Sequence, residues 1–214
     1  MLLLFWGLAA IPFYSRAQEA SSWAIIGLEI PSYTGDLNRY AQFNSGFTAG
    51  FRLNQRKNLN GQFLLSVGTL KGDNRRLDIL PGSESPNTFF RTSFIEVTYQ
   101  LHYYLLQRNH FRLYAGIGAG FLRFQPMDNE GTPLSDLPGT RAGNETYRNI
   151  TLALPVKLGG QYIFDNQFGV SFEAGWHNPL TDYLDNISEL GNGGLDNILF
   201  LRVNLMVPLG FKTD

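Results

Sequence analysis

The chain has 214 residues, and its 17 basic and 18 acidic side chains nearly cancel, which excludes the strongly basic surface of a nucleic-acid-binding protein. Charged residues make up only 16% of the chain, below the roughly 25% of an average soluble domain, whereas 23 glycines and 14% aromatic residues are high contents. The sequence contains no cysteine, which excludes disulfides, thiol catalysis and cysteine-based metal sites.

The first residues have the features of a secretory signal peptide. An apolar segment runs from Leu2 to Ile11, and Ser15-Arg16-Ala17 fits the small-x-small rule for cleavage. We therefore expect residues 1–17 to be a cleaved signal peptide and residues 18–214 to form one barrel domain. The alternative, an uncleaved membrane anchor, is disfavoured because the apolar segment is shorter than the about 20 residues that span a bilayer.

Eight later segments alternate between apolar and polar residues at period two. In the stretch FTAGFRLN, for example, every second residue is apolar, as in a strand whose side chains point to opposite faces of a sheet. Several of the eight reach the length of about nine to eleven residues that a tilted strand needs to cross a bilayer. The segments lie near residues 23–30, 46–54, 59–70, 91–105, 111–124, 147–164, 167–177 and 197–211.

The connections between these segments alternate strictly between short and long. The short polar turns QRKN, LQRNH and FDN join segments two to three, four to five and six to seven, and long polar loops make the other four connections. This order is typical of outer-membrane barrels, in which the short turns and both termini lie in the periplasm. We predict an all-β fold, an eight-stranded antiparallel up-and-down transmembrane β-barrel that contacts the lipid of the cell outer membrane.

In each segment the alternate residues form two sets, which we call the apolar parity and the polar parity. Aromatic residues of the apolar parity lie at the strand ends. Those beside the short turns are Tyr103, Phe111, Tyr162, Phe168 and Phe211, and those at the opposite ends are Phe47, Phe121 and Trp176, with Phe89 and Phe124 close by. Each set is expected to form a girdle at one membrane interface. The position of Trp23 along its strand places it at the short-turn end, but Trp23 lies on the polar parity. A bulge or a frayed first strand would explain this difference.

The alternation leaves open which face is inside. A soluble lipocalin-like barrel has the same pattern with its apolar residues in the interior. Its outer face would then be rich in Lys and Glu, whereas here the polar parity holds mostly small, uncharged residues such as Gly116, Gly118 and Gly120. We therefore expect the apolar parity to face lipid and the polar parity to line a narrow lumen.

The lumen parity also carries charged and ionisable residues. They are Glu29, Arg52, Glu96, His102, Arg112, Lys157, Glu173 and Arg202. Because an unpaired charge is costly to bury, we predict that these acids and bases pair across the lumen as a plug, which makes a closed barrel and not a passive pore. The alternative is that some lie at the mouths and are hydrated. Pro155 and Pro208 each remove a ladder hydrogen bond and are expected at bulges or rims.

Signals for chemistry are weak. AGIGAGF, residues 115–121, resembles a phosphate-binding glycine loop, but no helix follows it. His177 ends a strand, and the next loop supplies Asp182, Asp185, Ser188 and Glu189, the residue types of a lipid-modifying enzyme at the outer rim or of a metal site. No nucleophile lies at a defined spacing, so we predict no catalytic, cofactor-binding or metal-binding residues.

Four stretches together resemble a known family. They are FFRTSFIEVTYQLHYYL, RLYAGIGAGFLRFQP, ITLALPVKLGGQYIF, and the loop TDYLDNIS after a strand that ends in EAGWHN. This combination is similar to the small outer-membrane β-barrels of Bacteroidota, and in particular to the PorG-like branch of the type IX secretion and gliding apparatus. The family loop motif is Thr181, Asp182, Tyr183, Leu184 and Asp185.

The resemblance implies a non-enzymatic structural or anchoring component of an envelope complex that transports protein. Its partners would be periplasmic ring lipoproteins of the secretion apparatus. The short turns would contact them through Arg56, Lys57, Gln107, Arg108 and Asn109. The alternative is a cell-surface binding barrel that uses its long loops, residues 71–88 and 125–146, to hold an extracellular ligand.

Overall fold

The computed structural model describes residues 19–37, 39–73, 87–136, 146–188 and 194–211. The expected signal peptide lies outside these ranges, as do residues 74–86 and 137–145 of the two long loops considered for surface binding. Among the described residues, no helix has the length and hydrophobicity needed to cross a membrane.

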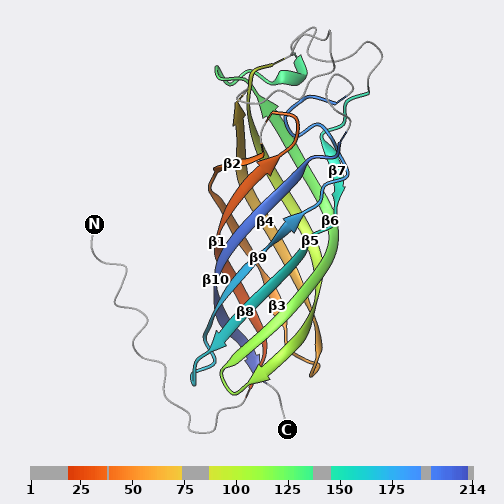
Figure 1. Ribbon diagram of the computed structural model, residues 1–214. Helices are drawn as coiled ribbons and strands as arrows, with labels where there is room; N and C mark the ends of the chain where they lie inside the picture. The colour runs from red at the N-terminus through yellow and green to blue at the C-terminus, as the bar shows by residue number, and fades with distance from the viewer. Residues whose placement is uncertain (1–18, 38, 74–86, 137–145, 189–193, 212–214) are drawn as a thin grey trace, which may run out of the picture.

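The described chain forms a closed antiparallel ring of eight strands (Figure 1). The strands are β1 (Ala20–Thr34), β3 (Gly46–Leu53), β4 (Leu59–Asp73), β5 (Phe89–Arg108), β6 (Phe111–Met127), the pair β7 (Ile150–Ala153) and β8 (Val156–Ile163), β9 (Gly169–His177) and β10 (Asn197–Phe211). Each strand pairs with its neighbour in the chain, and β1 pairs with β10 to close the ring. The eight-stranded up-and-down barrel predicted from the sequence is confirmed.

Two irregularities lie where proline residues were expected to cause them. The sixth segment is divided at Leu154 and Pro155 into β7 and β8, which both pair with β6. Pro208 pairs with Trp23 beside a register shift in β1. Two short elements were not expected: β2 (Arg39–Phe43), which pairs with the long-loop end of β1, and the 3₁₀ helix η1 (Leu134–Asp136).

Side-chain exposure decides which parity faces outward. Leu28 is 67% exposed while its neighbour Glu29 is 1% exposed, and Phe172 is 63% exposed while Glu173 is 4% exposed. An apolar exterior around a polar interior is the arrangement of a membrane-spanning barrel and the reverse of a soluble one. The apolar parity therefore faces lipid, as the sequence predicted.

This pattern inverts at the long-loop ends of the strands. In β5, buried Phe90 and Phe94 alternate with exposed Arg91 and Ser93. The same inversion occurs in β6, where Leu122 and Phe124 are buried and Arg123 and Gln125 are exposed. Here the barrel is apolar inside and polar outside, as in a protein surrounded by water. The strands therefore extend past the lipid-facing band, and beyond it mainly apolar side chains of β5 and β6 point into the lumen.

Two aromatic residues are placed differently from the girdle prediction. Phe124 is 1% exposed and lies inside the barrel, because it belongs to the lumen-facing residues of β6, which become apolar at the long-loop end of the strand. Trp23 is also fully buried, and its indole Nε1 donates to the carbonyl oxygen of Gln167 at 2.9 Å. It therefore helps to close the short-turn end of the lumen instead of joining the girdle.

The lipid-facing band predicts a position-dependent cost for a new charge. Leu101 lies in the middle of the outward apolar positions of β5, which run from Ile95 to Leu105. Replacing Leu101→Arg should lower the free energy of unfolding by about 2 to 4 kcal/mol, the cost of arginine near the bilayer midplane. Urea titration of the barrel folded into lipid vesicles measures this. The control, Ser93→Arg, lies on the same face beyond the band and should change little; equal losses for both variants would contradict the assigned band.

Candidate functional site

The lumen is crossed by a charge network centred on the carboxylate of Glu173. Its Oε1 accepts hydrogen bonds from Arg52 Nη2 at 2.5 Å and from the Tyr114 hydroxyl at 2.6 Å, and Lys157 Nζ lies 2.9 Å away as an ion pair. Its Oε2 accepts from Arg202 Nη1 at 2.9 Å. One glutamate from β9 therefore joins side chains of β3, β6, β8 and β10.

A second carboxylate extends the network toward the long-loop end. Glu29 Oε2 accepts a hydrogen bond from Arg202 Nε at 2.9 Å. The His177 ring lies between two glutamates, with Nδ1 2.9 Å from Glu96 Oε1 and Nε2 3.3 Å from Glu29 Oε1. The network thus continues from Glu173 through Arg202 and Glu29 to His177 and Glu96.

Neutral groups complete the coordination of the central arginine. Arg52 Nε donates to Gln62 Oε1 and its Nη1 donates to Gln161 Oε1, both at 2.7 Å. The guanidinium carbon also lies 4.9 Å from the centroid of the Tyr114 ring. A buried charge requires such saturation, because each unpaired donor in a low-dielectric interior carries a desolvation cost.

Glycine creates the space for these long side chains. A Cβ atom at Gly159 would lie 2.5 Å from Cζ of Tyr114, so only glycine leaves room for the ring whose hydroxyl binds Glu173. At Gly116, a Cβ atom would lie 3.0 Å from the His102 ring and 3.1 Å from the Lys157 side chain, which is also a tight contact. The small residues of the lumen parity are therefore the packing partners of the network.

The structure brings together six of the eight residues predicted for the plug. They are Glu29, Arg52, Glu96, Lys157, Glu173 and Arg202. His102 lies beside them without an ion pair and stacks on Tyr114, with ring centroids 4.8 Å apart. Arg112 lies apart, at the short-turn mouth, where it pairs with Glu19 and donates to Asn54 Oδ1. Its position near the start of β6 puts Arg112 at the mouth, the location that the alternative allowed for some of these residues.

Two members of the network were missed by sequence reasoning. Tyr114 and His177 lie on the same parity as Arg112 and Glu173, respectively, so their strand positions alone would have placed them in the lumen. His177 was instead considered for the outer rim. It is fully buried, and its two ring nitrogens face Glu96 and Glu29 and not the loop residues Asp182 and Asp185.

The loop acids also form no metal site in the described part of the chain. No group of three or more His, Asp or Glu residues there has an arrangement that would hold a metal ion. Ser188 is partly buried, and Glu189 lies outside the described residues.

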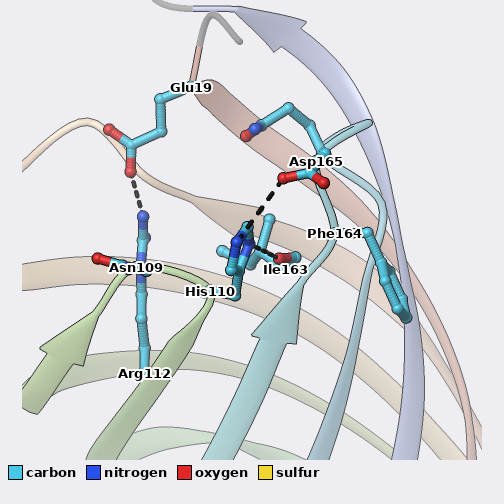
Figure 2. A pocket seen from close by; sticks show the side chains of 8 residues that line it. Glu19, Asn109, His110, Arg112, Ile163, Phe164 and Asp165 are labelled. Carbon is cyan, nitrogen blue, oxygen red and sulfur yellow. Dashed lines mark hydrogen bonds and ion pairs between the residues drawn. The ribbon is translucent and has the colours of Figure 1, made fainter.

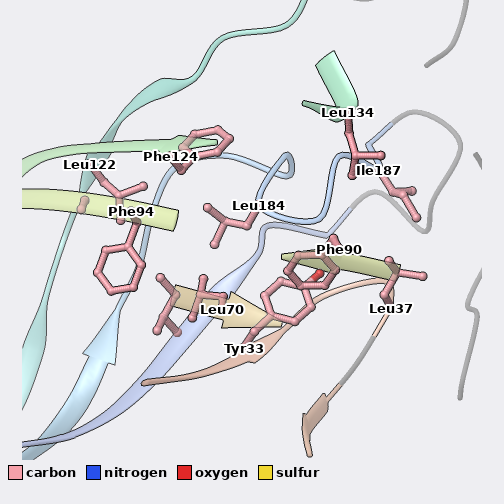
Figure 3. Packing of buried hydrophobic residues seen from close by; sticks show 12 residues of the cluster. Tyr33, Leu37, Leu70, Phe90, Phe94, Leu122, Phe124, Leu134, Leu184 and Ile187 are labelled. Atoms are coloured by element: carbon pink, nitrogen blue, oxygen red, sulfur yellow. The ribbon is translucent and has the colours of Figure 1, made fainter. Parts of the chain in front are cut away.

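The family loop motif is packed into the long-loop mouth of the barrel. Leu184 is fully buried in an apolar cluster that we name the outer core (Figure 3). The outer core consists of Tyr33, Leu37, Leu70, Phe90, Phe94, Leu122, Phe124, Leu134, Ala153, Leu184, Ile187 and Ile198, with Tyr147 and Tyr183 packed against it. The Thr92 hydroxyl donates to the Leu184 carbonyl, which fixes the loop to the inner wall of β5.

Below the motif, two loop carboxylates meet at one hydroxyl. The Tyr33 hydroxyl lies 2.5 Å from Asp185 Oδ2 and 2.9 Å from Asp196 Oδ1. Burial raises the pKa of Asp185 to about 7, and burial together with the charge of Asp185 raises the pKa of Asp196 well above its usual range. Asp36 and Asp182 add further negative charge nearby. A single hydroxyl proton cannot serve two ionised carboxylates, so this site favours retention of an additional proton.

The short-turn mouth contains a small polar pocket of about 240 Å³ (Figure 2). It lies between the turn around Asn109 and His110 and the turn around Asp165. His110 Nδ1 is 2.9 Å from the Ile163 carbonyl oxygen, and its Nε2 is 3.7 Å from Asp165 Oδ1. The ion pair of Glu19 with Arg112 forms another wall.

The predicted turn contacts surround this mouth as exposed residues. Arg56, Lys57, Gln107, Arg108 and Asn109 are all exposed, and Asn109 lines the pocket. Gln107 Nε2 donates to the Lys57 carbonyl oxygen at 2.8 Å and so ties the two turns together. The two turns therefore lie side by side and present three exposed basic residues, Arg56, Lys57 and Arg108.

Comparison with known proteins places the fold among outer-membrane barrels. No protein-family model and no curated protein matches the chain. Neisserial surface protein A has a similar structure, with a TM-score of 0.54 and 13% identity over 89% of this chain and 98% of that chain. Ail, the attachment invasion locus protein of Yersinia pestis, solved in complex with the heparin analogue sucrose octasulfate, has a TM-score of 0.51 and 13% identity over 88% and 97%. At this identity the similarity shows the fold alone.

The central position of Glu173 predicts a large loss of stability when its charge is removed. Glu173→Gln would leave Arg52, Lys157 and Arg202 without their shared counter-charge. Breaking a buried ion pair in this way costs about 3 to 5 kcal/mol, measured as the free energy of unfolding in lipid vesicles. Glu19→Gln, whose carboxylate is 42% exposed, is the matched control and should cost far less. Similar losses for the two variants would argue against a buried network.

The paired loop carboxylates predict pH-dependent docking of the motif. Because burial raises the pKa of Asp185 from 3.8 to about 7, its protonation contributes stability that is fully present at low pH and is lost as the pH rises through about 7. Hydrogen-exchange protection of the Leu37, Leu184 and Ile187 amides, which donate to these carboxylates, should fall roughly tenfold or more between pH 5 and pH 8.

The variant Asp196→Asn removes one of the two charges and should flatten this dependence. Protection factors that stay constant with pH in the unaltered protein would refute the shared-proton arrangement.

Proposed function

We propose that the chain is a non-enzymatic outer-membrane barrel that anchors a periplasmic assembly of the type IX secretion kind, with its termini and short turns in the periplasm. The observation that carries the proposal is the filled lumen. The charge network crosses the membrane-spanning part, the outer core fills one mouth, and Trp23 with the Glu19–Arg112 pair narrows the other. A barrel filled in this way acts through its two ends and not through a channel.

The short-turn end has the properties of a docking surface. Arg56, Lys57 and Arg108 are exposed on two turns that the Gln107–Lys57 hydrogen bond holds together. Rigid turns lower the entropic cost of association, and clustered basic residues favour an acidic partner. The adjoining pocket would accept a polar side chain between His110 and Arg112. The resemblance to the PorG-like branch supports ring lipoproteins as this partner.

A second candidate function is binding at the cell surface through the opposite end. The observation in its favour is the outer core, which gives the long-loop end a packed apolar interior of its own and hence a stable platform. The similar barrel of Ail, solved in complex with a heparin analogue, supports this second candidate.

Charge reversal tests the anchoring proposal. The combined variant Arg56→Glu, Lys57→Glu and Arg108→Glu should reduce capture of ring lipoproteins by tagged protein about tenfold or more, because it would repel an acidic partner. The measurement is a pull-down from gently solubilised outer membranes with the co-purifying proteins quantified by mass spectrometry. Arg39→Glu at the opposite end is the matched control and should leave capture unchanged.

Two results would count against anchoring. Ring lipoproteins recovered equally with the reversed turns would exclude these turns as the contact. A barrel recovered only with lipid, whichever variant is used, would shift the function to the surface-binding candidate.

A further inference from the structure

Four cationic side chains lie on the outer wall of the barrel just beyond the lipid-facing band. They are Lys71 on β4, Arg91 on β5, Arg123 on β6 and Arg148 just before β7, and we name them the basic belt. The three arginines are exposed and Lys71 is partly buried. Lys71, Arg91 and Arg123 belong to the outward-facing residues of their strands. Arg148 lies two residues before Ile150 and so has the same parity as this lipid-facing residue.

The strand register places Lys71 opposite Arg91 and the other two charges on the neighbouring segments. Lys71 pairs directly with Arg91, and Arg91 pairs with Met127, four residues beyond Arg123 on the same strand. Arg123 in turn pairs with Ile150, so Arg148 lies two residues farther along the next chain segment. The basic belt therefore covers one continuous sector of the wall from β4 to β7.

Like charges directly opposite one another across a strand pair destabilise a sheet unless a counter-charge is present. In the described part of the chain, no carboxylate forms an ion pair with Lys71, Arg91, Arg123 or Arg148.

Two acids at this end of the barrel are engaged elsewhere. Asp73, two residues beyond Lys71, accepts a hydrogen bond from Gln42. Asp128 accepts hydrogen bonds from the backbone amides of Glu130 and Thr132. The counter-charge of the basic belt must therefore come from outside this part of the chain.

The level of the basic belt indicates what that counter-charge is. Ile95, Phe121 and Ile150 are exposed apolar residues that end the band on this sector. A cation directly beyond the band, pointing sideways from the wall, lies at the level of lipid headgroups rather than above the loops. Arginine suits phosphate there, because its planar fork donates two parallel hydrogen bonds to phosphate oxygens.

We propose that the basic belt binds the phosphate groups of the glycolipid in the outer leaflet of the outer membrane. The inference rests on the proposed orientation, in which the long loops lie outside the cell. Bound glycolipid would supply the missing counter-charge and fix the depth and rotation of the barrel in the membrane.

Lipid retention tests the proposal. The combined variant Arg91→Gln, Arg123→Gln and Arg148→Gln keeps polar side chains on the exposed wall and should still fold. Each protein is placed in nanodiscs that contain phosphorylated lipid A, and the lipid A retained after detergent release is counted by native mass spectrometry. The unaltered barrel should retain at least about tenfold more than the variant.

Two controls make the result specific. Nanodiscs with dephosphorylated lipid A should abolish the difference between the two proteins. The variant Arg56→Gln, Lys57→Gln and Arg108→Gln removes the same number of charges at the opposite end and should retain lipid A normally. Equal retention by the unaltered barrel and the belt variant, or retention that ignores the phosphates, would overturn the proposal.

The orientation can be checked separately because the sequence has no cysteine. Glu130→Cys at the exposed long-loop end should react with a membrane-impermeant maleimide on whole cells. Failure to label would place the basic belt at the inner leaflet and overturn this inference, while loss of ring capture alone would leave it intact.

Discussion

The carboxylate of Glu173 binds two arginines, a lysine and a tyrosine hydroxyl inside a barrel too narrow to admit bulk water around each of them. Buried charges repay their desolvation only when every partner is in place. This requirement explains the composition of the lumen: glycines such as Gly159 leave room for the rings, and amides such as Gln62 and Gln161 satisfy the remaining donors. It also explains why the membrane-spanning part of the chain is closed, since the network uses the space that a channel would need.

The second constraint is the change of solvent along each strand. Within the bilayer the apolar parity must face outward, whereas beyond it the same strands must turn apolar residues inward. β5 meets both demands in one continuous strand, with Phe90 and Phe94 inside at one end and Val97 and Tyr99 outside farther along. The outer core that results gives the loop motif a place to dock, with Leu184 inserted and Asp185 and Asp196 held at Tyr33. The same strands therefore form two parts of the barrel, a lipid-facing part with a polar interior and a long-loop end with an apolar interior.

Sequence reasoning reached the parts of this structure that depend on period and loop length. Strand number, pairing order and the lipid-facing parity all follow from local alternation, which is why Glu29, Glu173 and Arg202 were placed correctly in the lumen. The position of a residue along the barrel axis depends on strand register, which the alternation does not give. The separation of Arg112 from the network could therefore not be predicted from the sequence. The outer core was missed because the inward-facing residues of each strand were assumed to be polar along its whole length. The pocket at the short-turn mouth joins Glu19, Asn109 and Asp165, residues far apart in the chain whose meeting only the closed ring determines.

Closure of the lumen underlies the proposed function, because an open pore would make transport of solutes the simplest function. Planar-bilayer recording of the purified, reconstituted protein tests it directly. A plugged lumen should leave the bilayer electrically silent after insertion, with incorporation verified by recovery of folded barrel from the membrane. Reproducible, stepwise conductance from the unaltered protein would contradict the plugged lumen and with it the view that the barrel acts through its two ends.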